Sequence, residues 1–530
     1  MTKKKAEKNS SSTFVTLEMK RPMHQAIKFI IDRLIAGDRN LDLLKRQASK
    51  QYGVDVIKNP LILEHFPKSK LTAEFKALLL KKPAKTMSGV TPVAVMIKPD
   101  DSCNQKCIYC PFTGLAAKSY VGFEPAALRG RQYNFDPYRQ TKSRVEQLES
   151  AGHNTDKCEI IVMGGTFLRM PIIYKKSFIK GIYDALNKKK SKSLELAIKT
   201  NQTTKRRAIG LTIETRPDVC IKYIDEMLSY GATRVELGIQ HADDKIYELI
   251  QRGHQVKDVF DATRELKNSA FKVLYHVMPG LPGSNKKKDI AFVKKLFADD
   301  AFRPDMLKIY PTLVIEGTGL HKMMLDGKYE PYSSEHAADV ISDFYKYIPK
   351  YVRVMRIQRD IPAQKIDAGV KKSNLRELVE QKIREKGIIP NEIRYREIKS
   401  KCCDLSDFEL RRLDYGASGG KEIFLSYEND DDLIAGFLRL RFPDKSNRKQ
   451  IDGHSALVRE LHIYGPEIQL KGMGKVQHMG FGSKLLKLAE EIAKDAGKDR
   501  ILVISGVGVR EYYKKHGYVL EGPYMCKTLD

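Results

Sequence analysis

The chain has 530 residues, enough for two to four domains at roughly 150 residues each. No apolar run approaches the ~18 residues that cross a membrane, and the lysine-rich start leads into serines rather than the apolar core of a signal peptide. Eight cysteines, three of them close together, are too few and too clustered for a disulfide framework in a chain of this length, so we expect a cytoplasmic protein with no membrane partner. The 94 Lys plus Arg outnumber the 66 Asp plus Glu, and the resulting net charge of +28 indicates a polyanionic partner.

The first 90 residues form the first predicted region, and basic side chains occur there in small groups. Lys20 with Arg21 and Lys81 with Lys82 are examples. Any single group is more simply explained as a solvated face. The summed excess would neutralise several phosphates and give steeply salt-dependent binding, so we predict that this region contacts RNA.

From residue 91 to about residue 390, short β-rich runs alternate with helical stretches. The predicted strands are residues 93–97, 158–163, 211–215, 235–239, 273–277 and 306–309. Repeated βα units build a parallel sheet, closed fully or partly into a barrel, whose active site gathers at the carboxyl ends of the strands.

The loop after the first predicted strand carries Cys103, Cys107 and Cys110. Thiolates are the ligands of iron–sulfur clusters, and three of them can hold three irons of a 4Fe-4S cluster while the fourth iron stays open. The alternative is a zinc knuckle with its fourth ligand elsewhere. Tyr109 before the last cysteine and the apolar strand upstream favour the cluster. The segment resembles that of the radical SAM enzymes, in which the open iron binds S-adenosylmethionine.

Other strand ends in this region carry glycines or polar residues. Gly164, Gly165 and Thr166 follow the strand that ends at residue 163, and glycines there let backbone groups approach the amino and carboxylate groups of S-adenosylmethionine. Polar groups also end the three following strands, in runs that start at Glu214, Glu236 and His276. Ordinary turn chemistry is the alternative for each run alone, so the weight rests on the set.

A connector and a second domain follow. Residues 374–386 predict a charged helix, with Gly387 as its C-cap and Pro390 as a stop. Beyond it, residues 422–427 and 433–441 predict antiparallel strands joined by an acidic turn. We therefore expect a separate domain over residues 391–530.

The C-terminal domain has its own cofactor motif in residues 477–482, which fits the Q/R-x-x-G-x-G/A loop of the GNAT acetyltransferases. Gly480 and Gly482 would expose backbone N–H groups to a pyrophosphate, and a helix beginning at about Ser483 would point its positive end at the same anion. Upstream, residues 457–463 predict a strand that cradles the acetyl and pantetheine arms. Tyr513, next to Tyr512, could donate a proton to a leaving thiolate, and a packed aromatic is the alternative for both.

With both motifs in one chain, the sequence resembles the family of Elongator catalytic subunits, the radical SAM acetyltransferases that modify the wobble uridine of tRNA. The resemblance spans roughly residues 75–530 and is most specific in residues 122–125, 144–148, 163–167, 459–465 and 522–525. It implies an α/β fold, with a radical SAM partial βα barrel and connector over residues 91–390 and a GNAT-type α+β acetyltransferase domain over residues 391–530. Residues 1–90 would bind tRNA.

The same resemblance implies a two-cofactor reaction. The reduced 4Fe-4S cluster cleaves S-adenosylmethionine, the resulting radical takes hydrogen from the methyl group of acetyl-CoA, and the new carbon radical adds to uridine C5; thioester hydrolysis then leaves a 5-carboxymethyl group. The residues that it implies at the acetyl-CoA site are Lys157, Arg459, Glu460, Leu461, His462, Ile463, Gly480, Phe481, Gly482, Ser483 and Tyr513.

Several points depart from the family or stay open. Many relatives carry a cysteine-containing zinc site near an Arg-Glu pair, but residues 390–395 contain no thiol before Arg396 and Glu397, so we predict no zinc there. A protein lysine acetyltransferase with a structural iron–sulfur cluster, and an RNA-binding scaffold with vestigial sites, are the alternative functions. The sequence leaves open the electron donor, the choice of tRNA, and whether Elongator-like partner subunits or self-association are needed.

Overall fold

A computed structural model describes residues 20–80, 89–398, 405–464 and 480–529. The chain divides into two compact units, one formed by Met1–Met87 with Ser143–Thr155 and the other by Ser88–Lys142 with Asp156–Asp530. Lys81, Lys82 and residues 477–479 of the predicted loop lie outside the described residues. Among the described helices, none combines the length and apolarity that a bilayer crossing requires.

The smaller unit is helical and has its own apolar core. Its helices include α2 (Lys20–Ile35), α3 (Leu41–Tyr52), α4 (Asn59–His65) and α5 (Ala73–Leu79). Helix α3 starts where the Asn40 side chain accepts a hydrogen bond from the Leu43 N–H, and it ends at Gly53 in the left-handed conformation. Ala26, Ile30 and Leu34 follow one another at the spacing of a helix face and are fully buried. The sequence predicted a basic region here but not this packed unit.

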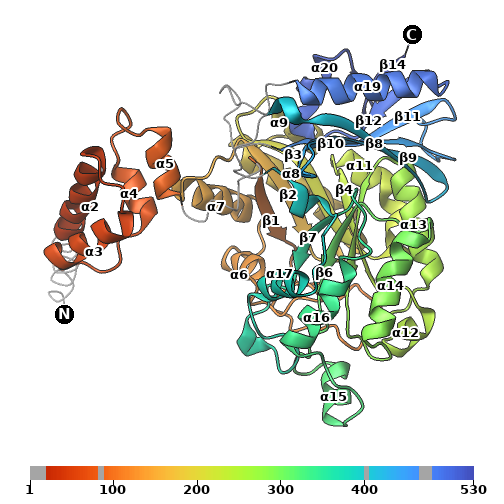
Figure 1. The fold of residues 1–530 in the computed structure, drawn as a ribbon, viewed down its shortest axis with the longest axis horizontal. Coiled ribbons are helices and arrows are strands. Elements are labelled where there is room, and N and C mark those ends of the chain that lie inside the picture. Colours follow the sequence, from red (N-terminus) through yellow and green to blue (C-terminus); the bar gives the residue numbers. More distant parts are fainter. Residues whose placement is uncertain (1–19, 81–88, 399–404, 465–479, 530) are drawn as a thin grey trace, which may run out of the picture. The chain divides into compact units, whose positions relative to one another are not determined.

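The larger unit begins with the predicted parallel sheet (Figure 1). Its seven strands are ordered by sequence from β1 to β7. The strands are β1 (Thr91–Met96), β2 (Lys157–Met163), β3 (Arg207–Thr215), β4 (Arg234–Gln240), β5 (Lys272–Val277), β6 (Met306–Ile309) and β7 (Arg353–Ile357). The six predicted strands are confirmed, and β7 is the one that was missed.

Helices connect and follow these strands along the chain. They are α6 (Pro125–Gln132), α7 (Pro137–Ser150), α8 (Ile172–Asn187), α9 (Leu194–Asn201), α10 (Pro217–Cys220), α11 (Ile224–Ser229), α12 (Asp244–Leu249), α13 (Val256–Asn268), α14 (Lys286–Ala298), α15 (Gly319–Leu325), α16 (Ser334–Phe344), α17 (Leu375–Glu385) and α18 (Ile393–Arg396). Helix α17 is the predicted connector helix, and Gly387 after it has the positive φ of 62° expected of a cap.

The C-terminal part is a mixed sheet with the strand order β13-β14-β12-β11-β10-β9-β8. Its elements are β8 (Glu409–Ala417), β9 (Gly420–Glu428), β10 (Ile434–Phe442), β11 (Ser455–Ile463), α19 (Phe481–Asp495), β12 (Arg500–Val503), α20 (Arg510–Lys514), β13 (Val519–Glu521) and β14 (Tyr524–Thr528). Leu485, Leu486 and Ala489 of α19 pack into the apolar core of this sheet. The predicted fold class, a partial βα barrel followed by an α+β domain, is confirmed.

Candidate active site

The cysteine loop follows β1 and is tied to distant parts of the barrel. The Ile108 N–H donates to the Ile250 carbonyl at 3.1 Å, and the Leu320 N–H donates to the Ile108 carbonyl at 2.8 Å. The Lys118 ammonium donates to the carbonyls of Cys103 at 3.1 Å and Gln105 at 3.2 Å. These contacts hold the loop at the carboxyl ends of the strands, where the sequence placed it.

Burial and neighbouring charges shift the pKa values of two of the three thiols in this loop. Cys107 is buried, while Cys103 and Cys110 are partly buried. Burial alone would raise the pKa of Cys107, but the guanidinium groups of Arg252, 3.6 Å from its sulfur, and Arg216 lower it. Burial, followed by the charge of Cys107, raises the pKa of Cys110 to about 12.

Such a thiol trio fits a 4Fe-4S cluster. Bringing three thiolates together costs electrostatic energy, which binding to iron offsets, and the two arginines supply the positive charge that a thiolate-bound cluster favours. Sequence reasoning did not single out Arg252, because nothing in its local pattern sets it apart from any other arginine after a helix.

The Gly164–Thr166 turn lies beside this loop, directly after β2. Gly164 has a φ of +127°, and its N–H donates to a Glu214 carboxylate oxygen at 3.2 Å. The hydroxyl of Thr166 is buried without a hydrogen-bond partner among the described residues. An unpartnered buried hydroxyl beside an open glycine fits a polar cofactor such as S-adenosylmethionine, so the turn remains the predicted binding segment.

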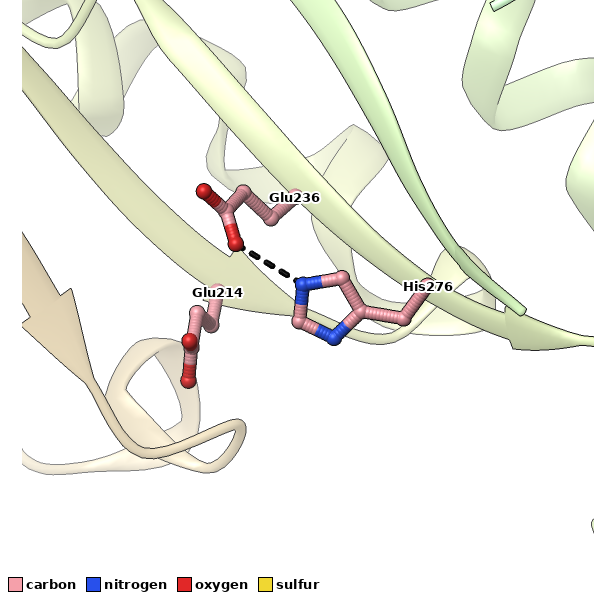
Figure 2. Close-up of side chains that lie close together, drawn as sticks. All are labelled: Glu214, Glu236 and His276. Carbon is pink, nitrogen blue, oxygen red and sulfur yellow. Dashed lines mark hydrogen bonds and ion pairs between the residues drawn. The ribbon is translucent and has the colours of Figure 1, made fainter. Parts of the chain in front are cut away.

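Glu214, Glu236 and His276, the first residues of the three polar runs in the sequence, do gather in the barrel (Figure 2). Glu214 and His276 lie one residue before the ends of β3 and β5, whereas Glu236 lies within β4. One ligand atom from each lies within 4.8 Å of the others, and His276 Nε2 is 2.8 Å from a Glu236 oxygen. Lys308 already bonds the same carboxylate, and Arg234 lies 3.5 Å from its other oxygen. Because two cations face Glu236, we interpret the group as a polar barrel lining rather than a metal site.

Substitution of the two glycines should separate structural from cofactor effects. A β-carbon at Gly164 would lie 2.5 Å from the Ile97 side chain in a strained conformation, so Gly164→Ala should cost about 1–3 kcal/mol of unfolding free energy. A β-carbon at Gly165 meets nothing within 4 Å, so Gly165→Ala should leave stability unchanged and weaken S-adenosylmethionine binding about tenfold. Urea unfolding and equilibrium binding measure the two effects; unchanged affinity in Gly165→Ala would remove this turn from the site.

Arg459, predicted at the acetyl-CoA site, lies in a buried ionic network between the C-terminal sheet and the barrel. Its guanidinium donates to Asp305 at 2.6 Å, to Glu422 at 2.8 Å and to the Phe271 carbonyl at 2.9 Å. The side chains of Arg459 and Asp305 are 0% exposed. Although burial would raise the pKa of Asp305, the charges of Arg459 and Lys267 hold it well below its usual value.

This network fixes which end of the barrel the C-terminal sheet covers. Asp305 and Phe271 immediately precede β6 and β5, so Arg459 docks β11 at the amino ends of the barrel strands. Lys157, the first residue of β2, lies at that same end of the parallel sheet, whereas the cysteine loop lies at the other. The side chain of Arg459 thus holds the two parts together, and any role in CoA binding falls to its backbone.

The other residues of β11 that were predicted at the acetyl-CoA site differ from one another in their surroundings. Glu460 accepts a hydrogen bond from Arg439 at 2.8 Å. The ring of His462 packs against Tyr464 at 4.5 Å between centroids, and its Nε2 is buried without a hydrogen-bond partner among the described residues. Leu461 and Ile463 pack against the apolar core of the sheet. The unpartnered imidazole nitrogen fits a nearby polar ligand, and the acetyl-CoA assignment of this strand stays a prediction.

Gly480 is the first residue of the predicted pyrophosphate loop that the structure describes. Gly480 has a φ of +72° at the start of α19, and the helix begins at Phe481 rather than at Ser483. A β-carbon at Gly482 would lie 3.2 Å from the Tyr512 hydroxyl, whereas Tyr513 is buried in the apolar core. Burial raises the pKa of Tyr513, which would keep it protonated as an acid must be. Its proton-donor role stays a prediction, and Tyr512 is the tyrosine beside the glycine loop.

A charge at the start of α19 should disrupt CoA binding. Gly480→Glu would place a carboxylate beside the N–H groups predicted to bind pyrophosphate, so we expect CoA affinity to fall by about a hundredfold. Gly480→Ala introduces the same positive-φ strain without the charge and should retain most of the affinity. Isothermal titration with CoA compares the two; equal affinities would exclude this loop from the site.

The comparisons with known proteins agree with the barrel and its thiol loop. The model of the Radical SAM superfamily matches residues 97–296, and that of the Radical_SAM C-terminal domain matches residues 304–385. The fold and the cysteine loop therefore define a radical SAM protein.

Relatives match the whole architecture. A "tRNA uridine(34) acetyltransferase" of Methanocaldococcus infernus is 51% identical over 85% of this chain and 88% of its own. "Elongator complex protein 3" of Homo sapiens is 39% identical over 95% of this chain and 96% of its own. The solved M. infernus Elp3 with an N-terminal deletion has 48% identity and a TM-score of 0.76, over 84% of this chain and 100% of that one. The chain belongs to the Elongator complex protein 3 family.

Proposed function

We propose that this enzyme modifies the wobble uridine of tRNA, adding a carboxymethyl group at C5 with acetyl-CoA and S-adenosylmethionine as co-substrates. The observation that carries the proposal is that one chain contains two elements: three thiols in one loop with two arginines beside the buried Cys107, and a glycine-capped helix on an acetyltransferase-like sheet. Its relatives are named for acetyltransferase activity on tRNA uridine 34.

The residues have separate tasks at the two ends of the barrel. Cys103, Cys107 and Cys110 would hold a 4Fe-4S cluster, which with S-adenosylmethionine supplies hydrogen-atom abstraction. Gly164, Gly165 and Thr166 would position S-adenosylmethionine by backbone contacts and one hydroxyl. Lys157, β11 and the start of α19 would bind acetyl-CoA.

The protein's charge favours tRNA as the partner. A net charge of +28 suits a polyanion, and residues 1–90 are our candidate for part of the binding surface. We propose that the enzyme works in the cytoplasm, and the Elongator name of several relatives supports partner subunits. Steep loss of tRNA affinity with added salt is expected; a flat salt response would remove the electrostatic argument.

The deciding experiment is anaerobic incubation of the reconstituted protein with dithionite, S-adenosylmethionine, acetyl-CoA and tRNA, followed by nucleoside mass spectrometry. A 5-carboxymethyluridine product that needs every component supports the proposal. Acetylation of a basic protein without reductant or S-adenosylmethionine would favour the lysine acetyltransferase instead. The names of the relatives do not favour that alternative.

A further inference from the structure

A cavity of about 730 Å³ lies between the barrel helices and the C-terminal sheet, away from the sites described above. It is lined by residues of α9 and α11 on the barrel side and by α20 and the turn between β13 and β14 on the other. Its volume falls within the roughly 300–1,000 Å³ typical of small-molecule sites. The cavity is thus large enough for a ligand well beyond a single ion.

Arg510 is the unusual group in this cavity. Its side chain lines the cavity, the residue is only 6% exposed, and its Nε is buried without a hydrogen-bond partner among the described residues. Burial lowers the pKa of Arg510, for which no ion pair is found within the described part of the chain, whereas the carboxylate partners of the buried Arg459 raise its pKa. A buried guanidinium without an ion-pair partner is costly, and an anion in the cavity would supply that partner.

The other lining groups describe the ligand. Lys199 and Lys514 add positive charge at the cavity, although Lys514 also pairs with Glu511. Of the two carboxylates in the lining, Glu195 and Asp225, the second is paired with Arg448. Ile198, Leu228 and Leu520 supply apolar walls, and Gln202 and Gln450 supply amides. Such a site suits a ligand that has a flat, largely apolar ring, hydrogen-bonding edges and an anionic group. A nucleotide has all three.

The cavity is distinct from the glycine loop at the start of α19. Arg510 and Lys514, one helical turn apart, present the same face of α20 to the cavity. Tyr512, on the other face, points its hydroxyl at Gly482. A ligand in the cavity therefore leaves the predicted CoA loop free.

We propose that this cavity binds a nucleotide, with its phosphate on Arg510 and Lys514 and its base between the apolar walls. The nucleotide can come from two sources, a free nucleoside phosphate or one residue of the bound RNA. Both present the same chemistry to the cavity, and the experiment distinguishes them.

Isothermal titration of AMP into the full-length protein tests the site, with CoA and S-adenosylmethionine present in excess so that AMP cannot occupy their adenosine subsites. We expect one AMP per chain, and adenosine or inorganic phosphate to bind about tenfold more weakly because each lacks half of the contacts. No AMP binding under these conditions, or displacement of AMP by further CoA, would overturn the proposal.

Neighbouring lysines on α20 give a matched pair of variants. Lys514→Glu should weaken AMP binding about tenfold, whereas Lys515→Glu, with the same charge change one residue outside the lining, should alter it less than about twofold. Arg510→Gln should abolish binding. Because that buried substitution can prevent folding, Ser229→Trp, which fills the cavity from its exposed rim, serves as a second test. Equal AMP affinity in Lys514→Glu, Lys515→Glu and Ser229→Trp would refute the site.

The source of the nucleotide follows from tRNA binding by the same variants. If an RNA residue enters the cavity, AMP competes with tRNA, and Lys514→Glu weakens tRNA binding more than Lys515→Glu. If a free nucleotide is the ligand, AMP leaves tRNA binding unchanged and the two variants bind tRNA alike. Either result supports the nucleotide site, and both are independent of uridine modification.

Discussion

Cys107→Ser should abolish assembly of the 4Fe-4S cluster and, with it, cleavage of S-adenosylmethionine. Cys107 is the buried member of the thiol trio and the one whose pKa is lowered, so it is the thiolate that the surrounding arginines favour most. A serine hydroxyl does not ionise near neutral pH and is a poor ligand for iron. We expect no reconstituted cluster absorbance and loss of activity to background.

The measurement combines iron and sulfide analysis with 5′-deoxyadenosine formation. Cys158→Ala, which removes a buried thiol from β2 rather than from the loop, should keep both. The tRNA affinity of Cys107→Ser should stay close to that of the unaltered protein. Full S-adenosylmethionine cleavage by Cys107→Ser would show that Cys107 does not bind the cluster.

Arg459→Met should destabilise the protein by about 3–5 kcal/mol, because it leaves buried carboxylates without their main counter-charge. Arg459 contacts Asp305 and Glu422, and all three side chains are at most 1% exposed. Lys267 and Arg441 would remain near the carboxylates. Lys267 lies farther from Asp305 than Arg459 does, and Arg441 shares Glu422 with Arg459. Urea unfolding followed by circular dichroism measures the loss.

Arg411→Met is the control for this substitution. Arg411 lies on β8 with its side chain 52% exposed, so its removal should change stability by less than about 1 kcal/mol. A double-mutant cycle with Asp305→Asn isolates the coupling between the two residues. If Arg459→Met cost no more than the control, the network would not hold the sheet to the barrel.

The parts of the site that were predictable from sequence are those carried by local patterns. A few consecutive residues encode each of three features: the cysteine spacing, the Gly164 turn and the six predicted barrel strands. In the structure, these strands lead to the end of the barrel at which the cysteine loop and the turn lie. The gathering of Glu214, Glu236 and His276 was only partly foreseeable: Glu214 and His276 lie one residue before the ends of β3 and β5, whereas Glu236 lies within β4, in register with Glu214.

What the sequence could not reveal depends on contacts between distant residues. Arg459 was predicted at the acetyl-CoA site from the family resemblance, but its side chain pairs with Asp305, which lies 154 residues away in the sequence. Tyr512 and Tyr513 are adjacent, and only the packing of α20 decides which faces the glycine loop. The helical core of the smaller unit was masked by its basic composition.

The network around Asp305 also bears on how the chain is made. During synthesis the barrel leaves the ribosome before Arg459, and at roughly 5–20 residues per second the 154-residue interval lasts about 8–30 s. During that interval the C-terminal sheet does not yet cover the amino end of the nascent barrel, where Asp305 and Lys267 lie. The C-terminal sheet thus completes the barrel after translation of its own strand β11, and a chain halted before that point should require a chaperone to remain soluble.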